Sequence, residues 1–285
     1  MNKLLRKVHL HPLLWLMIAV SAWTGHFREL LLIFFIIAVH EFGHAWMAHV
    51  FRWRIKQIIF LPFGGVAEVD EHGNRPIKEE LLVILAGPVQ HLWMFAAAWL
   101  LHEFSLLPDM VYHTFMQFNA AILLFNLLPV YPLDGGKLLL LFFSMTRPFL
   151  AAVHLTILSS AALLVLLQAG VLLFFSFHLQ AWLVLLYLAA ALWREWKEKH
   201  YTFIRFLLER HYGNQPAASA LQPLPADGEL EIGKVLERFR RNTKHIVYVS
   251  IKGGERVRLD ENELLHAYFS EKRTTARLIE LLPIH

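Results

Sequence analysis

The stretch "ELLLIFFIIAVHEFGHAWMAHV", residues 29–50, decides how this chain folds. It is long and apolar enough for a membrane-spanning helix, which needs about 20 mostly apolar residues. Within it stand three ionisable side chains, His40, Glu41 and His44. Each such group inside a membrane span costs at least about 2.5–3.5 kcal/mol on insertion scales. The sequence therefore predicts a partner within the membrane that compensates these three groups.

His40, Glu41 and His44 form the pattern HExxH. Residues four apart share one face of a helix, so the two imidazoles can meet one zinc ion at about 2.0–2.1 Å. Glu41 is then placed to act as a general base toward water. The chain has no cysteine, so any metal must be held by His, Asp or Glu. The alternative is a polar cluster facing a polar bundle interior, and the insertion cost favours the metal.

A catalytic zinc ion normally has three protein ligands and one open position. The best candidate for the third ligand lies in "NLLPVYPLDGG", residues 126–136, where two prolines and two glycines interrupt an apolar stretch. Asp134 is the sole carboxylate between positions 110 and 195. Its alternative role is to cap a helix that starts near Gly135. The need for a third donor favours Asp134 as a metal ligand.

The same interrupted segment supplies candidates for binding the substrate. Asn126 is expected to orient the substrate or stabilise an oxyanion, with Pro129 and Pro132 beside it. Asn126 has an equally simple alternative role, which is to satisfy backbone groups that the break sets free. Such freed groups are tolerated at membrane depth where they line a cavity.

The composition indicates an α-helical polytopic membrane protein. Hydrophobic side chains make up 56% of the chain and charged ones 18%, against about 25% in soluble domains. The apolar runs predict about six transmembrane helices, at residues 10–23, 29–50, 80–101, 111–128, 149–167 and 171–193.

Lysine and arginine flank these runs, mainly on one side of the expected membrane. The positive-inside rule then predicts that both termini are cytoplasmic. The net charge of +4 is therefore interpreted as a topology signal, and we expect no direct nucleic-acid partner. At 1.5 Å per residue, His44 lies roughly 22 Å from the outer start of its helix, closer to the cytoplasmic face.

A β-hairpin is expected between the second and third spans. Residues 58–60 and 66–69 flank a turn formed by Pro62, Phe63, Gly64 and Gly65. We expect this hairpin to be re-entrant, beside the metal site, because non-helical backbone at membrane depth survives only when protein or a wet cavity surrounds it. Phe63, Gly64 and Gly65 are then candidates for substrate contact, with one strand pairing to an extended peptide. The alternative is a hairpin on the cytoplasmic surface.

A small α/β module is expected after the membrane domain. We assign residues 1–200 to the membrane domain, 201–226 to a linker rich in Pro, Ala and Gly, and 227–285 to the module. The module is predicted to contain a helix at 230–239, strands at 245–252 and 256–259, and a helix that ends at Phe269. Asp260 and Glu263 form a capping-box pattern at the start of that last helix.

HEFGH in an early span, followed by Asn126, Pro129, Pro132 and a Leu-Asp-Gly sequence, resembles the site-2 protease family of intramembrane zinc metalloproteases. The resemblance covers roughly residues 8–200. It implies that His40, His44 and Asp134 bind one zinc ion and that Glu41 is the general base. The spaced second motif, six spans and C-terminal module are most similar to members that process a sporulation pro-sigma factor, pro-sigma-K. That similarity implies a membrane-associated pro-sigma substrate, inhibitory membrane partner proteins and a place in the outer forespore membrane.

Residues 245–269, "HIVYVSIKGGERVRLDENELLHAYF", resemble a CBS (cystathionine-β-synthase) domain. That resemblance implies binding of ATP or another adenine nucleotide. It also implies a homo-oligomer, because a single CBS unit needs a second copy to complete a CBS pair. Two other functions remain open. One is a zinc-binding membrane transporter, although the inverted repeats common in transporters are not visible. The other is a nucleotide-sensing membrane scaffold, which leaves Glu41 between two good metal ligands without a purpose.

Overall fold

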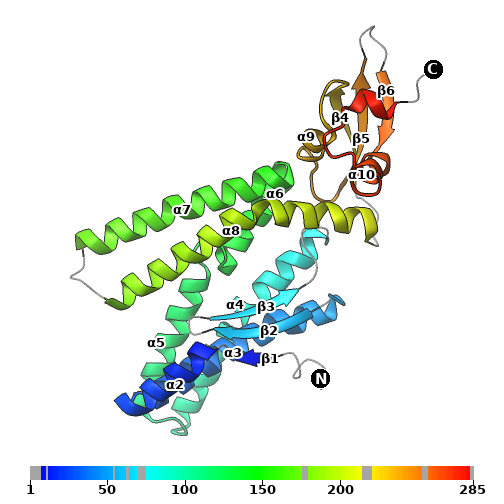
Figure 1. Cartoon of the computed structure of the whole chain (residues 1–285). Coiled ribbons are helices and arrows are strands. Elements are labelled where there is room, and N and C mark those ends of the chain that lie inside the picture. Colours follow the sequence, from blue (N-terminus) through cyan, green and yellow to red (C-terminus); the bar gives the residue numbers. More distant parts are fainter. Residues whose placement is uncertain are drawn as a thin grey trace. The chain divides into compact units, whose positions relative to one another are not determined.

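The computed structural model describes residues 8–10, 12–53, 55–61, 64–69, 75–174, 179–213, 220–251 and 256–282. These residues form two compact units. The first comprises residues 1–71, 78–138 and 162–189, and the second comprises 72–77, 139–161 and 190–285. In chain order the elements are β1 (Val8–Leu10), α2 (Pro12–Thr24), α3 (Phe27–Val50), β2 (Ile55–Leu61), β3 (Gly64–Val69), α4 (Ile77–Glu103), α5 (Asp109–Asn126), α6 (Asp134–Thr146), α7 (Phe149–Phe174), α8 (Leu179–Tyr212), β4 (Ala220–Asp227), α9 (Ile232–Leu236), β5 (Thr243–Ser250), β6 (Arg256–Asp260), α10 (Glu261–Phe269) and a 3-10 turn, η1 (Leu278–Leu281) (Figure 1).

Helices α3, α4 and α5 pack around two buried apolar clusters in the first unit. One cluster joins Ile36, Met94, Ala98 and Phe115, and the other joins Ala45, Ala48, Trp53 and Val83. The small side chains in these clusters let helix backbones approach closely, which is how membrane helices associate. This packing determines which side chains of α4 and α5 meet the HExxH face of α3.

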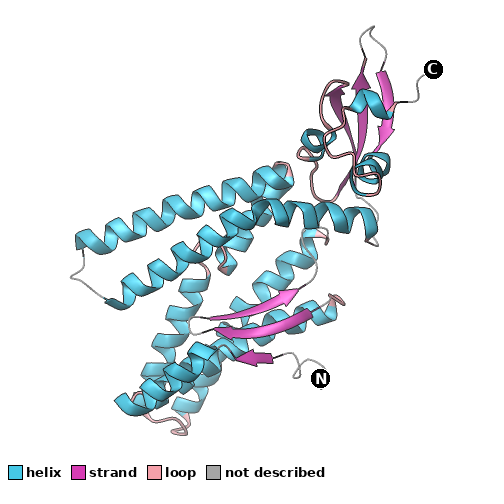
Figure 2. Cartoon of the chain, in the orientation of Figure 1, coloured by secondary structure: helices cyan, strands magenta, loops and turns pink. Residues whose placement is uncertain are grey.

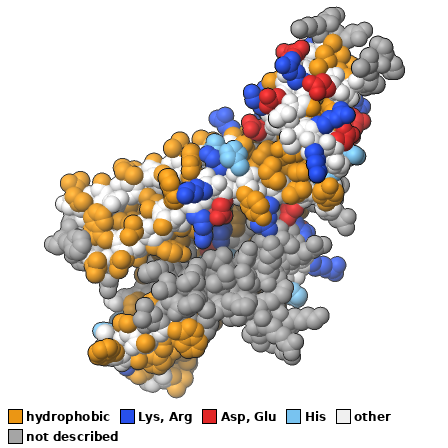
Figure 3. Space-filling view, viewed as in Figure 1, with side chains coloured by type: hydrophobic (Ala, Val, Ile, Leu, Met, Phe, Trp, Pro, Cys, Tyr) orange, Lys and Arg blue, Asp and Glu red, His pale blue; other side chains and the backbone are white. Residues whose placement is uncertain are grey.

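Three helices in the described parts of the chain are long and apolar enough to cross a membrane: Phe27–Val50, Ile77–Glu103 and Phe149–Leu173. Large apolar side chains on α7 remain exposed, among them Leu158 at 64%, Leu166 at 67% and Leu173 at 74%. Hydrophobic side chains cover much of the visible surface of α7 and α8, whereas Lys, Arg, Asp and Glu are frequent on the C-terminal strands and helices (Figure 3). The expectation of a helical membrane protein is thus confirmed, while the count of six spans stays a prediction.

The boundary between the fifth and sixth expected spans is wrong. The break expected at residues 168–170 falls inside α7, which continues to Phe174, and α8 begins at Leu179. Gly170 lies at this expected break, but one glycine inside a helix costs only about 1 kcal/mol relative to alanine. A Cβ added at Gly170 meets nothing within 4 Å, so this glycine serves no close contact.

The expected hairpin is present in a three-stranded sheet of order β1-β2-β3 (Figure 2). β2 and β3 are antiparallel, with Leu61 opposite Gly64. Gly64 and Gly65 therefore lie in β3 and not in the turn, while Pro62 and Phe63 lie outside the described residues. β1 pairs in parallel with β2, so Leu10 ends a strand instead of starting the first span, and α2 begins at Pro12.

A second three-stranded sheet, of order β4-β5-β6, forms the C-terminal module (Figure 2). β4 and β5 are parallel, β5 and β6 are antiparallel, and α9 lies between β4 and β5 in the chain. The helix expected at 230–239 is shorter, because α9 covers Ile232–Leu236. The Asp260–Glu263 capping box at the start of α10 is confirmed.

Two regular elements occupy most of the range 201–226 that was expected to be a linker. Helix α8 continues to Tyr212, and β4 starts at Ala220. Pro223 and Pro225 gave this segment the composition of a loop. Both lie on β4, an edge strand of its sheet, where proline is tolerated because fewer backbone N–H groups are needed.

A buried ion pair joins the end of α8 to the module within the second unit. Arg210 donates to the Glu261 carboxylate and to the Thr243 carbonyl, and both charged residues are at most 5% exposed. The backbone N–H of His245 donates to Glu261 Oε2 at 2.8 Å. Burial raises the pKa of Glu261, but the hydrogen bonds from His245 and Arg210 outweigh it and leave this pKa below its ordinary value.

Candidate metal centre

Three side-chain donors meet inside the first unit. His40 Nε2 lies 3.0 Å from His44 Nε2, and each of these nitrogens lies 3.1 Å from Asp134 Oδ2. All three residues are buried. Nearly equal separations of this size suit three ligands around one ion with bonds of about 2 Å, with a fourth position left open. The structure thus brings together the three predicted metal ligands.

Glycines allow Asp134 to reach the histidines. α5 ends at Asn126 and α6 begins at Asp134, so the seven residues between them must turn tightly. A Cβ on Gly135 would lie 2.2 Å from the Leu127 carbonyl oxygen, and one on Gly136 would lie 2.3 Å from the Tyr131 nitrogen. Only glycine fits at such separations, so the DGG sequence presses the start of α6 against this turn.

Asp134 uses its two oxygens differently. Oδ2 faces the two histidines, and Oδ1 accepts a hydrogen bond from Lys137 Nζ at 3.3 Å. Lys137 was not among the residues predicted from the sequence, although its position one turn after Asp134 on α6 could have suggested it. The lysine holds the carboxylate so that one oxygen is directed at the metal position.

The ring of His44 is oriented by a backbone carbonyl. Its Nδ1 lies 2.8 Å from the Val83 carbonyl oxygen on α4. A carbonyl only accepts, so Nδ1 carries the proton and the lone pair of Nε2 faces the other donors. Metal-binding histidines are commonly fixed in this way by a hydrogen bond from the second ring nitrogen.

Gly87 on α4 is a further residue that sequence reasoning missed. A Cβ at this position would lie 2.2 Å from His44 Nε2 and 2.8 Å from His40 Cε1. No larger residue fits without moving a ring of the metal site. The adjacent Pro88 lies inside the continuous helix α4, and a Gly-Pro pair within an apolar span is the signal that could have drawn attention to this segment.

The charge of this region suits a dication. Glu41 is 7% exposed and lies near enough to His44 and Lys137 to interact with them electrostatically. With neutral imidazoles, the two carboxylates of Glu41 and Asp134 exceed the single positive charge of Lys137. A zinc ion compensates this buried negative charge, so the donor set and the charges both fit zinc.

The other predicted site residues are not among the three donors. The Asn126 side-chain amide donates to the Ile122 carbonyl at 3.0 Å, within its own helix α5. Pro129 and Pro132 lie in the turn between α5 and α6. Gly64 and Gly65 belong to β3, and Phe63 lies outside the described residues. Their roles toward a substrate stay predictions.

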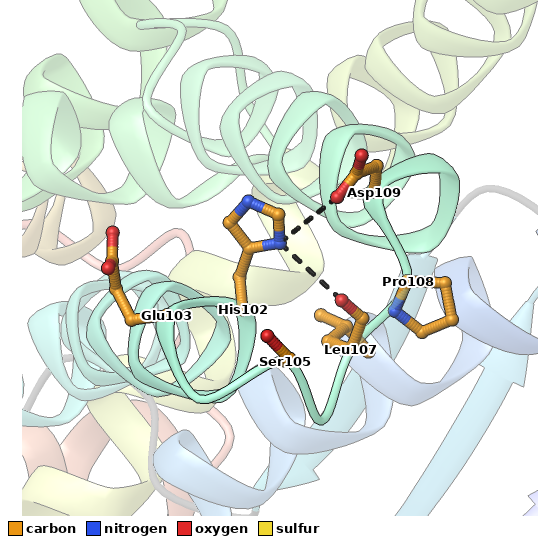
Figure 4. Close-up of a pocket in the computed structure, with 6 residues that line it drawn as sticks. All are labelled: His102, Glu103, Ser105, Leu107, Pro108 and Asp109. Atoms are coloured by element: carbon orange, nitrogen blue, oxygen red, sulfur yellow. Dashed lines mark hydrogen bonds and ion pairs between the residues drawn. The ribbon is translucent and has the colours of Figure 1, made fainter.

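A surface pocket of about 370 Å³ lies elsewhere, at the turn between α4 and α5 (Figure 4). Its lining residues are His102, Glu103, Ser105, Leu107, Pro108 and Asp109. His102 Nδ1 faces the Leu107 carbonyl at 3.4 Å and Asp109 Oδ1 at 3.7 Å. These residues lie at the C-terminal end of α4, in the following loop and at the start of α5, and none of them is among the three metal donors, so the pocket is separate from the metal centre.

Two histidines and a carboxylate around one open metal position, with a glutamate beside them and a helix long enough to cross a membrane beneath them, define a membrane-embedded metallopeptidase. The model of Peptidase family M50 matches residues 29–108. The chain is 45% identical over 285 residues to Stage IV sporulation protein FB of Bacillus subtilis, covering 99% of each protein. The chain belongs to peptidase family M50.

A sequence match and a solved structure, both from Methanocaldococcus jannaschii, add to this result. A zinc metalloprotease of Methanocaldococcus jannaschii is 31% identical over 112 residues, which are 38% of this chain and 32% of that protein. The solved structure of the Site-2 Protease from the same organism superposes with a TM-score of 0.54 at 26% identity, covering 66% of this chain and 89% of that one. The predicted intramembrane zinc metalloprotease of the site-2 type is therefore confirmed, and the CBS assignment is not.

Proposed function

We propose that this protease cleaves the membrane-associated pro-sequence of a sporulation sigma factor, pro-sigma-K, near the cytoplasmic face. The observation that carries the proposal is the cluster of His40, His44 and Asp134 with 3.0–3.1 Å between donors and Glu41 beside it. The similarity to a sporulation protein over 99% of both chains supports the substrate class.

In the proposed reaction His40, His44 and Asp134 hold the zinc ion. When bound, zinc supplies Lewis-acid activation of water and of the scissile carbonyl. Glu41 accepts the proton of the attacking water and later delivers it to the leaving amine. Burial of Glu41 keeps bulk water away from this proton transfer. Lys137 keeps its hydrogen bond to Asp134 Oδ1 and so fixes the direction of the other oxygen.

The substrate is proposed to bind as an extended strand. A helical peptide hides its carbonyl in internal hydrogen bonds, so the scissile segment must first unwind. β1 covers one edge of β2, whereas β3 is an edge strand of the described sheet and contacts α3. We assign the pairing to β3, the edge strand that contains Gly64 and Gly65. Phe63, Asn126, Pro129 and Pro132 are proposed to line the path of the peptide.

The setting of the enzyme is part of the proposal. Six spans would put both termini on the same side of the membrane, and the flanking lysines and arginines favour the cytoplasmic side. The membrane is proposed to be the outer forespore membrane of a sporulating bacterium. Inhibitory membrane proteins are expected partners. The C-terminal module, with β4 parallel and β6 antiparallel to β5, is proposed to be a CBS-like unit. Its resemblance to CBS domains is the ground for proposing that it binds ATP or another adenine nucleotide and joins copies of the chain.

The test is co-expression with candidate membrane-associated pro-proteins, followed by measurement of the cleaved fraction. The native chain is compared with Glu41→Gln and Asp134→Asn. Glu41→Gln should retain zinc and lose cleavage, and Asp134→Asn should lose both. Cleavage by Glu41→Gln at the native rate would show that Glu41 is not the base, and unchanged zinc content in Asp134→Asn would remove Asp134 from the ligands.

A further inference from the structure

Two buried polar residues outside the donor set form a chain that ends on the ligand His40. His91 of α4 and Asn119 of α5 are both 0% exposed. His40 Nδ1 lies 3.0 Å from His91 Nε2, and His91 Nδ1 lies 2.6 Å from Asn119 Oδ1. Asn119 Nδ2 in turn donates to the backbone carbonyl of His91 at 3.1 Å.

The backbone carbonyl of His91 settles where each proton lies. A carbonyl only accepts, so the nitrogen of the Asn119 amide must face it and Oδ1 must face the His91 ring. His91 Nδ1 therefore carries a proton, and the neutral ring has its lone pair on Nε2. That lone pair accepts the proton of His40 Nδ1. His40 is left with an unprotonated Nε2, which is the atom directed at His44 and Asp134.

We infer that His91 and Asn119 are positioning residues that hold the ring of His40 in the tautomer and orientation needed to bind zinc. The inference rests on the proposed zinc site and adds two residues to it. His91 is not a fourth ligand in this arrangement, because both of its ring nitrogens are already hydrogen-bonded, one of them to the far side of His40.

The packing of three helices makes the hydrogen-bonded chain of His40, His91 and Asn119 rigid. His40 belongs to α3, His91 to α4 and Asn119 to α5, and these helices share the buried cluster of Ile36, Met94, Ala98 and Phe115. A polar group left unsatisfied at this depth costs several kcal/mol, so the chain of hydrogen bonds is stable only when complete. The carbonyl of Val83 does the same for His44, so each ligand histidine has its own support.

The experiment measures zinc affinity of the purified full-length protein by competition with a chelator. His91→Met and Asn119→Leu keep approximate volume and remove the hydrogen bonds. Each should weaken zinc binding about 10–100-fold, as loss of such supporting partners does. His91→Gln can accept from His40 and donate to Asn119 at once, so its zinc affinity should stay close to native. A purely structural role would not distinguish Gln from Met in this way.

The control is Thr156→Val on α7, which removes a buried hydroxyl bonded to the Ala152 carbonyl and should leave zinc affinity unchanged. The absorption spectrum of the cobalt-loaded protein gives a second reading, since it should change in His91→Met and not in His91→Gln. Native affinity in both His91→Met and Asn119→Leu would overturn the inference while leaving the zinc site intact. Absence of zinc binding by the native chain would overturn the zinc site and the inference together.

Discussion

Replacing Gly87 by alanine tests whether α4 forms a wall of the metal site. The added Cβ would lie 2.2 Å from His44 Nε2, 2.5 Å from His44 Cε1 and 2.8 Å from His40 Cε1. Nonbonded heavy atoms rest at about 3.5–4.0 Å, so the closest contact is short by roughly 1 Å or more. Either the His44 ring or the backbone of α4 has to move by that distance.

The size of the movement predicts the size of the effect. Metal–ligand distances tolerate changes of only about 0.2 Å, so a ring displaced by this much no longer binds in the native geometry. A misplacement of about 1 Å in a catalytic site costs about 100-fold in rate. Gly87→Ala should therefore lose most of its zinc and at least that factor in cleavage.

Zinc content of the purified protein and cleavage of a co-expressed substrate are measured together. Gly170→Ala is the matched control, because it makes the same substitution inside a helix where a Cβ meets nothing within 4 Å. It should keep zinc and activity. If Gly87→Ala holds a full complement of zinc and cleaves at the native rate, the position assigned to α4 against His44 is wrong.

Three further perturbations address neighbouring features. Lys137→Met removes the hydrogen bond that Lys137 donates to Asp134 Oδ1. Because the Lys137 side chain is 45% exposed, this bond is weak, and zinc affinity should fall by less than about 10-fold in the same chelator competition. Glu261→Gln breaks a buried pair and should destabilise the C-terminal module by about 3–5 kcal/mol, measured by hydrogen exchange of β5 and α10. The pKa of Glu261 is lower in the folded module than in the unfolded chain. Ionised Glu261 therefore stabilises the module fully above the unfolded pKa of about 4.3, and this stabilisation is lost as pH falls through the folded pKa. Glu261→Gln should lack that acid dependence. Asp260→Ala removes the cap of α10 and should cost about 0.5–2 kcal/mol, seen as faster exchange in its first turn, whereas unchanged exchange would contradict the capping role.

Local patterns predicted the parts of this protein that depend on local physics. His40 and His44 share a face because they are one turn apart on a helix, and the structure holds their Nε2 atoms 3.0 Å apart. The lack of other carboxylates in the later spans singled out Asp134, which the structure places with them. The capping box of α10 depends on residues three apart and was equally readable.

Where the sequence misled, a local signal was outweighed by tertiary context. Pro223 and Pro225 read as loop residues, yet an edge strand tolerates them once β5 supplies the pairing partner. The break expected at residues 168–170 does not occur, because the apolar helix α7 continues through it and tolerates Gly170. β1 was missed because three residues carry no pattern of their own, and their strand exists only by pairing with β2.

The sequence by itself thus determined the chemistry of this protein: a membrane span with HExxH, a distant aspartate and no cysteine admit few sites other than a histidine–carboxylate zinc centre. Only the tertiary structure decided what surrounds that centre. His91, Asn119 and Gly87 stand on helices remote in sequence from α3, and no periodicity connects them to it. The physical reason is that ligand identity follows from the donor atoms of a few residues, whereas ligand orientation follows from how three helices pack.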